Sequence, residues 1–270
     1  IKSEPLAGAG TFRPGPMAES WNPYDILPTI TEKTVDWISG QTKEKPFFAY
    51  LAFNSPHYPI VPNEEFHGTS RAGYYGDFVV ETDAMVGKVL KALDEAGLTD
   101  NTMVIFSADN GPENHAFERL EAFGQWSSGA FRGLKRDIYE GGHRVPFIVR
   151  WPGQVPAGSV SDQLCCLTDL MATLAEVTGA SLPNEAAEDS ASLLGVWRGE
   201  QAEPVHDYVI HQGFGGDRFL AIRQGPWKLL AHQGSGGNAY DRHPRLKAYQ
   251  LPNVAPQAAG QLYNLDTDPG

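Results

Sequence analysis

A helical apolar pattern followed at once by a strand-like run most constrains the fold of this chain. Between Tyr74 and Ala96 apolar residues recur every three or four positions, and Gly97 follows as a C-terminal cap would. After a short polar turn the chain continues as MVIFSA at 103–108, and a similar apolar run, FFAYLAF at 47–53, precedes the helix. This order predicts an α/β domain with a mainly parallel central sheet flanked by helices.

The C-terminal part of the chain indicates a smaller, β-rich unit. Three short β-like runs are separated by glycine-rich turns, at 208–211, 219–223 and 227–230. A stretch rich in Ala, Glu, Ser and Pro precedes them and is typical of a linker. A chain of 270 residues is long enough for one large domain and one small one.

These observations define three expected segments. Residues 1–183 would form part of a large α/β domain, 184–204 a linker, and 205–270 a small α+β subdomain built on an antiparallel sheet.

Composition excludes some partners. The formal net charge of -12 opposes general binding to a nucleic-acid backbone, which requires clustered basic residues. The chain has no apolar run of about 18 residues, so we expect no membrane span. The two cysteines, Cys165 and Cys166, are adjacent, a geometry that disfavours pairing. We interpret them as small buried apolar residues, with a redox or metal role as the alternative.

Two oxygen-bearing residues end the run at 103–108. Asp109 and Asn110 follow it directly, and Gly111 allows the backbone to turn sharply. Ligands of α/β sheets bind beyond the carboxyl ends of strands, and Ca²⁺ and Mg²⁺ prefer such hard oxygen ligands. Asp-Asn-Gly is also a common turn sequence, so a plain turn is the alternative.

Two further polar residues are candidates for chemistry. His57 stands between two prolines in SPHYP, where it could donate a proton to a leaving group or bind an oxyanion. Lys135 precedes YEGGHRVP, in which Glu140 and Arg144 could pair and order the segment. Each has a plain alternative, a structural or surface histidine and a solvated lysine.

Taken in order, several stretches of the chain resemble the sulfatase family, most closely its arylsulfatase A-like branch. They are SPHYP at 55–59, YGDFVVETDAMVGKVLKALDEAGLTDNTMVIFSADNGPE at 75–113 and GLKRDIYEGGHRVPFIVRWPG at 133–153. The resemblance implies an alkaline-phosphatase-like sulfatase fold, present in part, and hydrolysis of a sulfate ester to an alcohol or phenol and sulfate.

The resemblance also implies roles for single residues. The family's Asp-Asn pair, which binds one Ca²⁺ ion together with two earlier aspartates, falls on Asp109 and Asn110. The family's sulfate-contacting lysine falls on Lys135, and its histidine near the leaving-group oxygen falls on His57. His57 and Lys135 are thus the expected catalytic and substrate-binding residues.

One family feature is missing from the chain. The family's nucleophile is a formylglycine made from Cys or Ser in a Cys/Ser-x-Pro-x-Arg motif, and these 270 residues contain no such motif. We expect the chain to be a piece of a longer protein whose preceding segment carries the formylglycine and the other two aspartates. The piece alone would be inactive.

Alternatives within and outside the superfamily remain open. The whole protein could be a phosphonate or phosphate ester hydrolase of the same superfamily, or a binding relative without catalysis. For a sulfatase the resemblance implies a sulfated small molecule or carbohydrate as substrate. It also implies a periplasmic or extracellular location in a bacterium, or a lysosomal one in a eukaryote.

Overall fold

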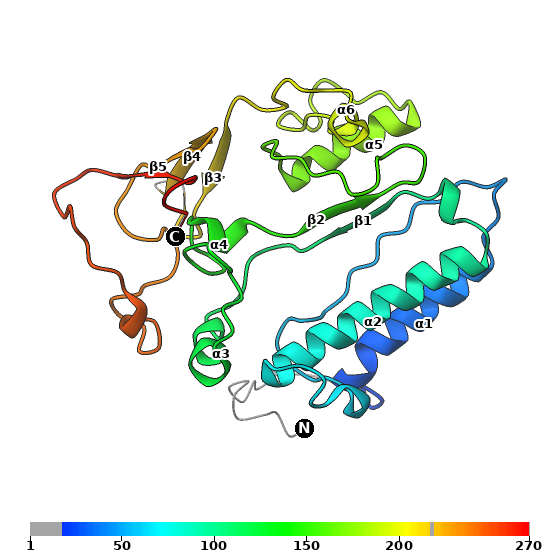
Figure 1. Cartoon of the computed structure of the whole chain (residues 1–270), viewed down its shortest axis with the longest axis horizontal. Helices are drawn as coiled ribbons and strands as arrows, with labels where there is room; N and C mark the ends of the chain where they lie inside the picture. Colours follow the sequence, from blue (N-terminus) through cyan, green and yellow to red (C-terminus); the bar gives the residue numbers. More distant parts are fainter. Residues whose placement is uncertain (1–17, 217–218, 270) are drawn as a thin grey trace. The chain divides into compact units, whose positions relative to one another are not determined.

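The structure is a computed structural model that describes residues 18–216 and 219–269 (Figure 1). Its helices are α1 (Ile26–Ser39), α2 (Gly73–Glu95), α3 (Ala116–Phe123), α4 (Glu140–His143), α5 (Leu170–Thr178) and α6 (Leu194–Arg198). Its strands are β1 (Val104–Ser107), β2 (Phe147–Arg150), β3 (Val209–Gln212), β4 (Leu220–Gln224), β5 (Trp227–Leu230) and β6 (Gln261–Asn264).

The chain divides into two compact units. Unit 1 comprises Ile1–Thr102 and His115–Trp126, and unit 2 comprises Met103–Asn114 and Ser127–Gly270. The domain boundaries expected from composition stay a prediction. The stretch expected to be a linker contains α6, which buries Leu194 and Trp197.

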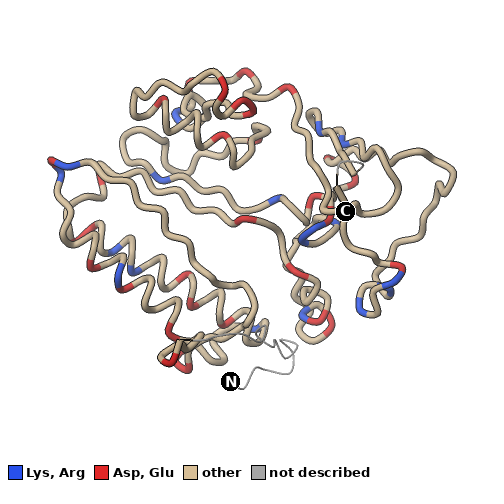
Figure 2. Tube along the Cα trace, turned by 180° about the vertical axis from the view of Figure 1, so that it is seen from behind, with Lys and Arg blue, Asp and Glu red and all other residues tan. Residues whose placement is uncertain are grey.

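Unit 1 is built on the paired helices α1 and α2, which lie side by side (Figure 1). The helix predicted from Tyr74 to Ala96 is confirmed as α2, because Phe78, Met85 and Leu93 fall on one buried face. Phe78 and Met85 pack in a core cluster with Leu27 of α1. Figure 2 shows acidic and basic residues interspersed along both helices.

The strand expected at 47–53 does not form in the described structure. This stretch is extended but unpaired, and Phe48 and Tyr50 are 73% and 85% exposed. An apolar run becomes a strand only when a neighbouring strand satisfies its backbone groups, and the described residues supply no such partner here.

The remaining central strands, β1 and β2, belong to unit 2 and pair antiparallel. Val104 lies opposite Arg150, and Ser107 lies opposite Phe147. The expectation of a mainly parallel sheet is therefore wrong for the strands that the structure describes. Apolar runs indicate strands but carry no information on their direction, and antiparallel strands are common in otherwise parallel sheets.

The predicted C-terminal antiparallel sheet is confirmed as β3-β4-β5-β6. The three predicted runs became β3, β4 and β5, whereas β6 was missed. Ala221 and Leu230 on the inner face pack against Ile138 and Tyr139, so the sheet supports the segment that follows Lys135.

Two smaller outcomes concern the cysteines and the membrane. Cys165 is exposed and Cys166 is half-buried, so their assignment to the core is wrong. The reason is that residues 161–166 lie at the surface without regular structure. Across residues 18–216 and 219–269, every helix is too short or too polar to cross a bilayer.

Candidate active site

The end of β1 presents two oxygen-bearing side chains. Asp109 is exposed, and Asn110 is half-buried with its Nδ2 donating to the Gly111 carbonyl at 2.9 Å. The carboxylate of Asp109 and the amide oxygen of Asn110 are therefore the two hard oxygen donors at this strand end.

Gly111 fastens this strand end to α4. Its N–H donates to the Gly142 carbonyl at 3.0 Å. A β-carbon at residue 111 would overlap the Gly141 carbonyl oxygen, so glycine is required by close approach of the two backbones. The two glycines of the EGG sequence thus lie directly against the end of β1.

The turn that carries Lys135 is joined to the same segment. The Lys135 N–H donates to the Pro112 carbonyl at 2.8 Å, three residues beyond Asp109. The structure therefore brings Asp109, Asn110 and the Lys135 turn together within unit 2. Among the described residues the half-buried Lys135 ammonium makes neither a hydrogen bond nor an ion pair, which leaves its donors for a ligand.

A second contact between these segments is an ion pair. Arg136 Nη1 lies 2.6 Å from Glu113 Oε1. Burial would raise the pKa of Glu113, but hydrogen bonds from Arg136 and the Asn114 N–H, together with the charge of Arg136, outweigh it and lower that pKa. Both side chains are about one-third exposed, so the pair adds little to stability.

A buried carboxylate, Glu140, anchors α4 to the C-terminal sheet. Its oxygens lie 2.8 Å from Lys228 Nζ, 2.9 Å from Arg223 Nη1 and 3.4 Å from Arg144 Nη1. Burial opposes ionisation, but the charge of Lys228 and its hydrogen bond prevail and lower the pKa of Glu140 to about 2. The pairing with Arg144 expected from the sequence is confirmed.

The stronger partner of Glu140, Lys228, was missed. One signal could have found it. Because side chains alternate along a strand, Lys228 in WKLL falls on the same face as Leu230, which is buried. A lysine on the inner face of a strand requires a carboxylate partner.

Two stacked histidines border this ion cluster. The rings of His143 and His211 are 4.0 Å apart, and Lys228 Nζ lies 2.7 Å from His143 Nε2. An ammonium can only donate, so His143 accepts and is neutral. Burial and the charge of Lys228 lower the pKa of His143 to about 2 and that of His211 to about 4.

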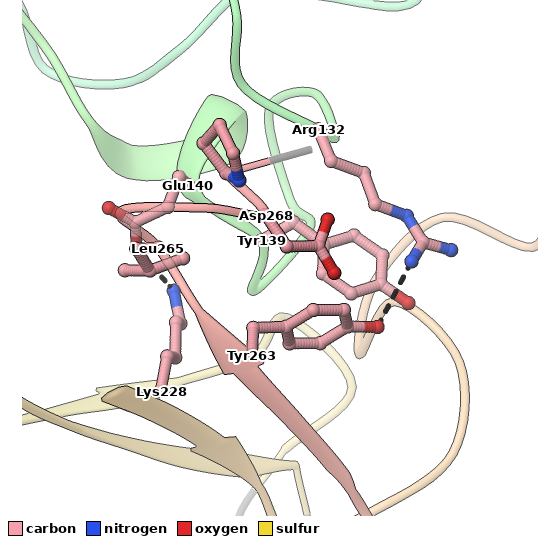
Figure 3. A pocket seen from close by; sticks show the side chains of 8 residues that line it. Arg132, Tyr139, Glu140, Lys228, Tyr263, Leu265 and Asp268 are labelled. Carbon is pink, nitrogen blue, oxygen red and sulfur yellow. Dashed lines mark hydrogen bonds and ion pairs between the residues drawn. The ribbon is translucent and has the colours of Figure 1, made fainter. Parts of the chain in front are cut away.

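Two pockets lie near these segments. Figure 3 shows the smaller one, where Arg132 Nη1 donates to the Tyr263 hydroxyl at 3.0 Å and the guanidinium stacks 4.1 Å from the centre of the Tyr139 ring. Its volume of about 10 Å³ suits one water molecule. The larger pocket, about 460 Å³, borders Pro112, Gly141 and Arg144 and has the size of a small-molecule site.

His57 belongs to unit 1. Its backbone N–H donates to the Asn54 carbonyl at 3.0 Å, and its ring Nδ1 lies 2.8 Å from the Tyr58 carbonyl. Since a carbonyl only accepts, Nδ1 carries a proton, and in the neutral ring of this exposed residue Nε2 is an acceptor. In that tautomer, neutral His57 accepts a proton at Nε2 and donates one from there only when charged.

The donor set at the end of β1 fits a hard cation in kind but not in number. Asp109 and Asn110 supply two oxygens, whereas Ca²⁺ takes six to eight. Within the part of the chain that the structure describes, no group of three or more His, Cys, Asp or Glu residues could hold a metal.

Family models match most of the chain. A model of the sulfatase family matches residues 14–180. A second model, described as N-sulphoglucosamine sulphohydrolase, C-terminal, matches residues 129–236. The two matches together include His57, Asp109, Asn110 and Lys135.

Curated relatives of this chain are named as sulfatases. An N-acetylgalactosamine-6-O-sulfatase from Bacteroides thetaiotaomicron is 35% identical over 269 residues, which cover 94% of this chain and 48% of the relative. Human arylsulfatase A is 34% identical over 234 residues, which cover 86% of this chain and 44% of the relative. The chain thus spans about half the length of these relatives.

Solved structures share the fold. A sulfatase from work on glycosaminoglycan metabolism by Bacteroides thetaiotaomicron has a TM-score of 0.77 and 34% identity, covering 92% of this chain and 50% of that one. The PsFucS1 sulfatase from Pseudoalteromonas has a TM-score of 0.73 and 25% identity, covering 91% of this chain and 47% of that one.

Proposed function

This chain belongs to the sulfatase family, and we propose that the protein containing it hydrolyses sulfate esters of carbohydrates. The observation that carries the proposal is the joining of two segments in unit 2. The Asp109–Asn110 end of β1 is hydrogen-bonded to the Lys135 turn and to α4, so two hard oxygen donors and an uncommitted cation belong to one rigid assembly. A sulfate ester requires such charges around its oxygens.

Each proposed residue has a distinct task. Asp109 and Asn110 would hold Ca²⁺, which neutralises sulfate oxygens when bound. Lys135 would bind a sulfate oxygen through its ammonium and stabilise the charge that develops on it. His57, whose Nδ1 contacts the Tyr58 carbonyl, would use Nε2 to bind the leaving-group oxygen and, when charged, to protonate it.

The Ca²⁺ ion and the nucleophile of the whole protein are also proposals. Family membership supports one Ca²⁺ ion and a formylglycine nucleophile, while the 270 residues themselves contain no Cys/Ser-x-Pro-x-Arg motif. We also propose that the segment up to residue 183 is part of the catalytic domain. Residues 205–270 would then form a subdomain that supports it.

The names of several relatives support the proposed substrate class. Two relatives are a bacterial N-acetylgalactosamine-6-O-sulfatase and a human N-acetylgalactosamine-6-sulfatase. A solved neighbour at 25% identity is a complex with a neocarrahexaose. Sulfated carbohydrates are therefore proposed ahead of simple aryl sulfates. A periplasmic or extracellular bacterial location, or a lysosomal one in a eukaryote, is proposed from the family resemblance alone.

The test is a rate comparison in the full-length protein. Sulfate release is measured from N-acetylgalactosamine 6-sulfate and 4-nitrophenyl sulfate, and phosphate release from 4-nitrophenyl phosphate. Lys135→Ala and His57→Ala should each lower kcat on the sulfate esters at least about a hundredfold, which is roughly 3 kcal/mol on the barrier.

Lys91→Ala is the matched control, because Lys91 is an exposed lysine that pairs with Glu95 in the next turn of α2. It should leave kcat unchanged. Phosphate release without sulfate release would overturn the proposed reaction. Wild-type kcat in Lys135→Ala would remove that residue from the site.

A further inference from the structure

The turn that carries Lys135 adopts a backbone shape that must be imposed from outside. Gly133 and Arg136 have φ values of +90° and +82°. Arg136 is not a glycine, and a non-glycine residue keeps a positive φ only when its surroundings hold it there. Lys135 lies between these two positions, so whatever fixes the turn also fixes the direction in which the Lys135 side chain leaves the backbone.

The carboxylate of Asp137 closes this turn. It is only 4% exposed and accepts from the Leu134 N–H at 2.9 Å, two residues before Arg136. Tyr240 Oη donates to the same carboxylate oxygen, Oδ2, at 2.7 Å. Burial raises the pKa of Asp137 although these hydrogen bonds oppose the rise, so its partners are directional and neutral.

Asn238 connects Asp137 to Lys135. Its Nδ2 donates both to the Lys135 carbonyl at 2.9 Å and to Asp137 Oδ1 at 2.9 Å. Its backbone N–H also donates to Asp137 Oδ1, at 3.0 Å. One carboxamide, about a hundred residues away in sequence, therefore holds the peptide unit of Lys135 and the carboxylate that closes its turn.

The loop around Asn238 is itself packed against the turn. Ser235 accepts from the Ile138 N–H at 2.7 Å through its carbonyl. A β-carbon at Gly237 would overlap the Arg136 carbonyl oxygen, so this position requires glycine. Residues 235–240 and 133–138 thus interlock through backbone as well as side-chain contacts, all within unit 2.

We propose that Asn238 is a positioning residue for the sulfatase reaction, which with Asp137 sets the direction of Lys135. The inference rests on the proposed function, because it assigns Asn238 a catalytic effect only through Lys135. A displacement of about 1 Å at a group that binds the reacting oxygens is enough to lower a rate by one to two orders of magnitude.

A double-mutant cycle in the full-length protein tests this effect. Asn238→Ala should lower kcat on N-acetylgalactosamine 6-sulfate about tenfold with little change in KM. In a Lys135→Ala background, the same substitution should cost less than about twofold, because its effect passes through the missing ammonium.

Gln233→Ala is the matched control, since the Gln233 carboxamide also donates to two backbone carbonyls of unit 2, those of Ala258 and Gly260. It should change kcat less than about twofold. Equal losses from Asn238→Ala in both backgrounds, or equal losses from Asn238→Ala and Gln233→Ala, would overturn the inference. If Asn238→Ala does not fold, Asn238→Ser replaces it, because the serine hydroxyl is a polar group but can donate only one hydrogen bond, whereas Nδ2 donates to both the Lys135 carbonyl and Asp137.

Amide hydrogen exchange separates this inference from the proposed function. If the wild-type protein releases no sulfate, the proposed function fails. The hydrogen bonds of Asn238 to Lys135 and Asp137 still predict amide exchange at Lys135 and Ile138 that is at least about tenfold faster in Asn238→Ala. Unchanged exchange at both amides would show that Asn238 does not hold the turn, whatever the activity of the protein.

Discussion

Two neighbouring regions of unit 2 bury a carboxylate in opposite ways. The turn at 133–138 surrounds Asp137 with neutral donors, and burial raises its pKa. The helix α4 places Glu140 among cations, chiefly Lys228, which overcome the effect of burial and lower its pKa to about 2. Both side chains are nearly inaccessible, at 4% and 2% exposed.

The difference teaches what each region contributes. Hydrogen bonds from neutral donors depend on angle, so Asp137 defines the shape of the turn that carries Lys135. Charge attraction depends less on angle, so Glu140 holds α4 to β4 and β5 and tolerates small movements. One region therefore sets geometry, and the other holds two elements together.

The largest expected effect is the loss of the Glu140 charge. Glu140→Gln keeps the volume but leaves Lys228 buried without a counter-ion, so the free energy of unfolding should fall by about 3–5 kcal/mol. Urea unfolding measures the change. Glu113→Gln is the matched control, because the Glu113–Arg136 pair is about one-third exposed and should contribute less than about 1 kcal/mol. Similar losses in both variants would contradict the description of Glu140 as a buried carboxylate held by cations.

The pH dependence sharpens the same contrast. Because the pKa of Glu140 falls from its ordinary 4.5 to about 2, its contribution is present above pH 4.5 and is lost as the pH falls toward 2. The raised pKa of Asp137 acts in the opposite sense, so the contribution of Asp137 to stability is lost as the pH rises through this raised pKa. Glu140→Gln should therefore flatten the decline in stability between pH 4.5 and 2.

A smaller effect is expected at the turn. Asp137→Asn replaces one acceptor oxygen with an amide group that faces the donors of Leu134, Asn238 or Tyr240. The free energy of unfolding should fall by about 1–3 kcal/mol, measured by urea unfolding. A loss as large as that of Glu140→Gln would show that Asp137 acts through charge and not through direction.

Removing one donor alone should cost less again. Tyr240→Phe deletes the hydroxyl that donates to Asp137 Oδ2 at 2.7 Å and keeps the aromatic ring. We expect a loss of about 0.5–1.5 kcal/mol in the free energy of unfolding. A loss above that of Asp137→Asn would show that the Tyr240 hydroxyl stabilises the fold through more than its hydrogen bond to Asp137.

The smallest effect at neutral pH is expected at His211, because its contribution to stability changes only as the pH falls below 6.5. Burial and Lys228 lower the pKa of His211 from 6.5 to about 4, so the unfolded chain takes up a proton in this range that the folded chain excludes. Its contribution is present above pH 6.5 and is lost as the pH falls toward 4. His211→Asn should flatten the stability curve over that interval, and an unaltered slope would contradict the buried state of this ring.

Local patterns predicted the parts of the fold that depend on near neighbours. The 3.6-residue spacing located α2, and the apolar runs located β1 and the three strands β3 to β5. The position of Asp109 and Asn110 at a strand end followed from the same reasoning, and motif order singled out Lys135. Whether these residues act in catalysis stays a prediction.

Long-range partners could not be predicted in this way. Glu140 and Lys228 are separated by 88 positions, and the link from Asn238 to Lys135 spans 103. The antiparallel direction of β1 and β2 and the unpaired state of residues 47–53 likewise depend on which strands become neighbours. Periodicity encodes which face of an element is buried, not what that face meets.

The central claim is that the end of β1 and the Lys135 turn form one sulfate-ester site. A crystal structure of the full-length protein with Ca²⁺ and inorganic sulfate tests it most directly. We predict Asp109 and Asn110 oxygens about 2.3–2.6 Å from the cation and Lys135 Nζ about 2.7–3.2 Å from a sulfate oxygen. Calcium bound by other residues, or a sulfate that Lys135 does not reach, would contradict the account.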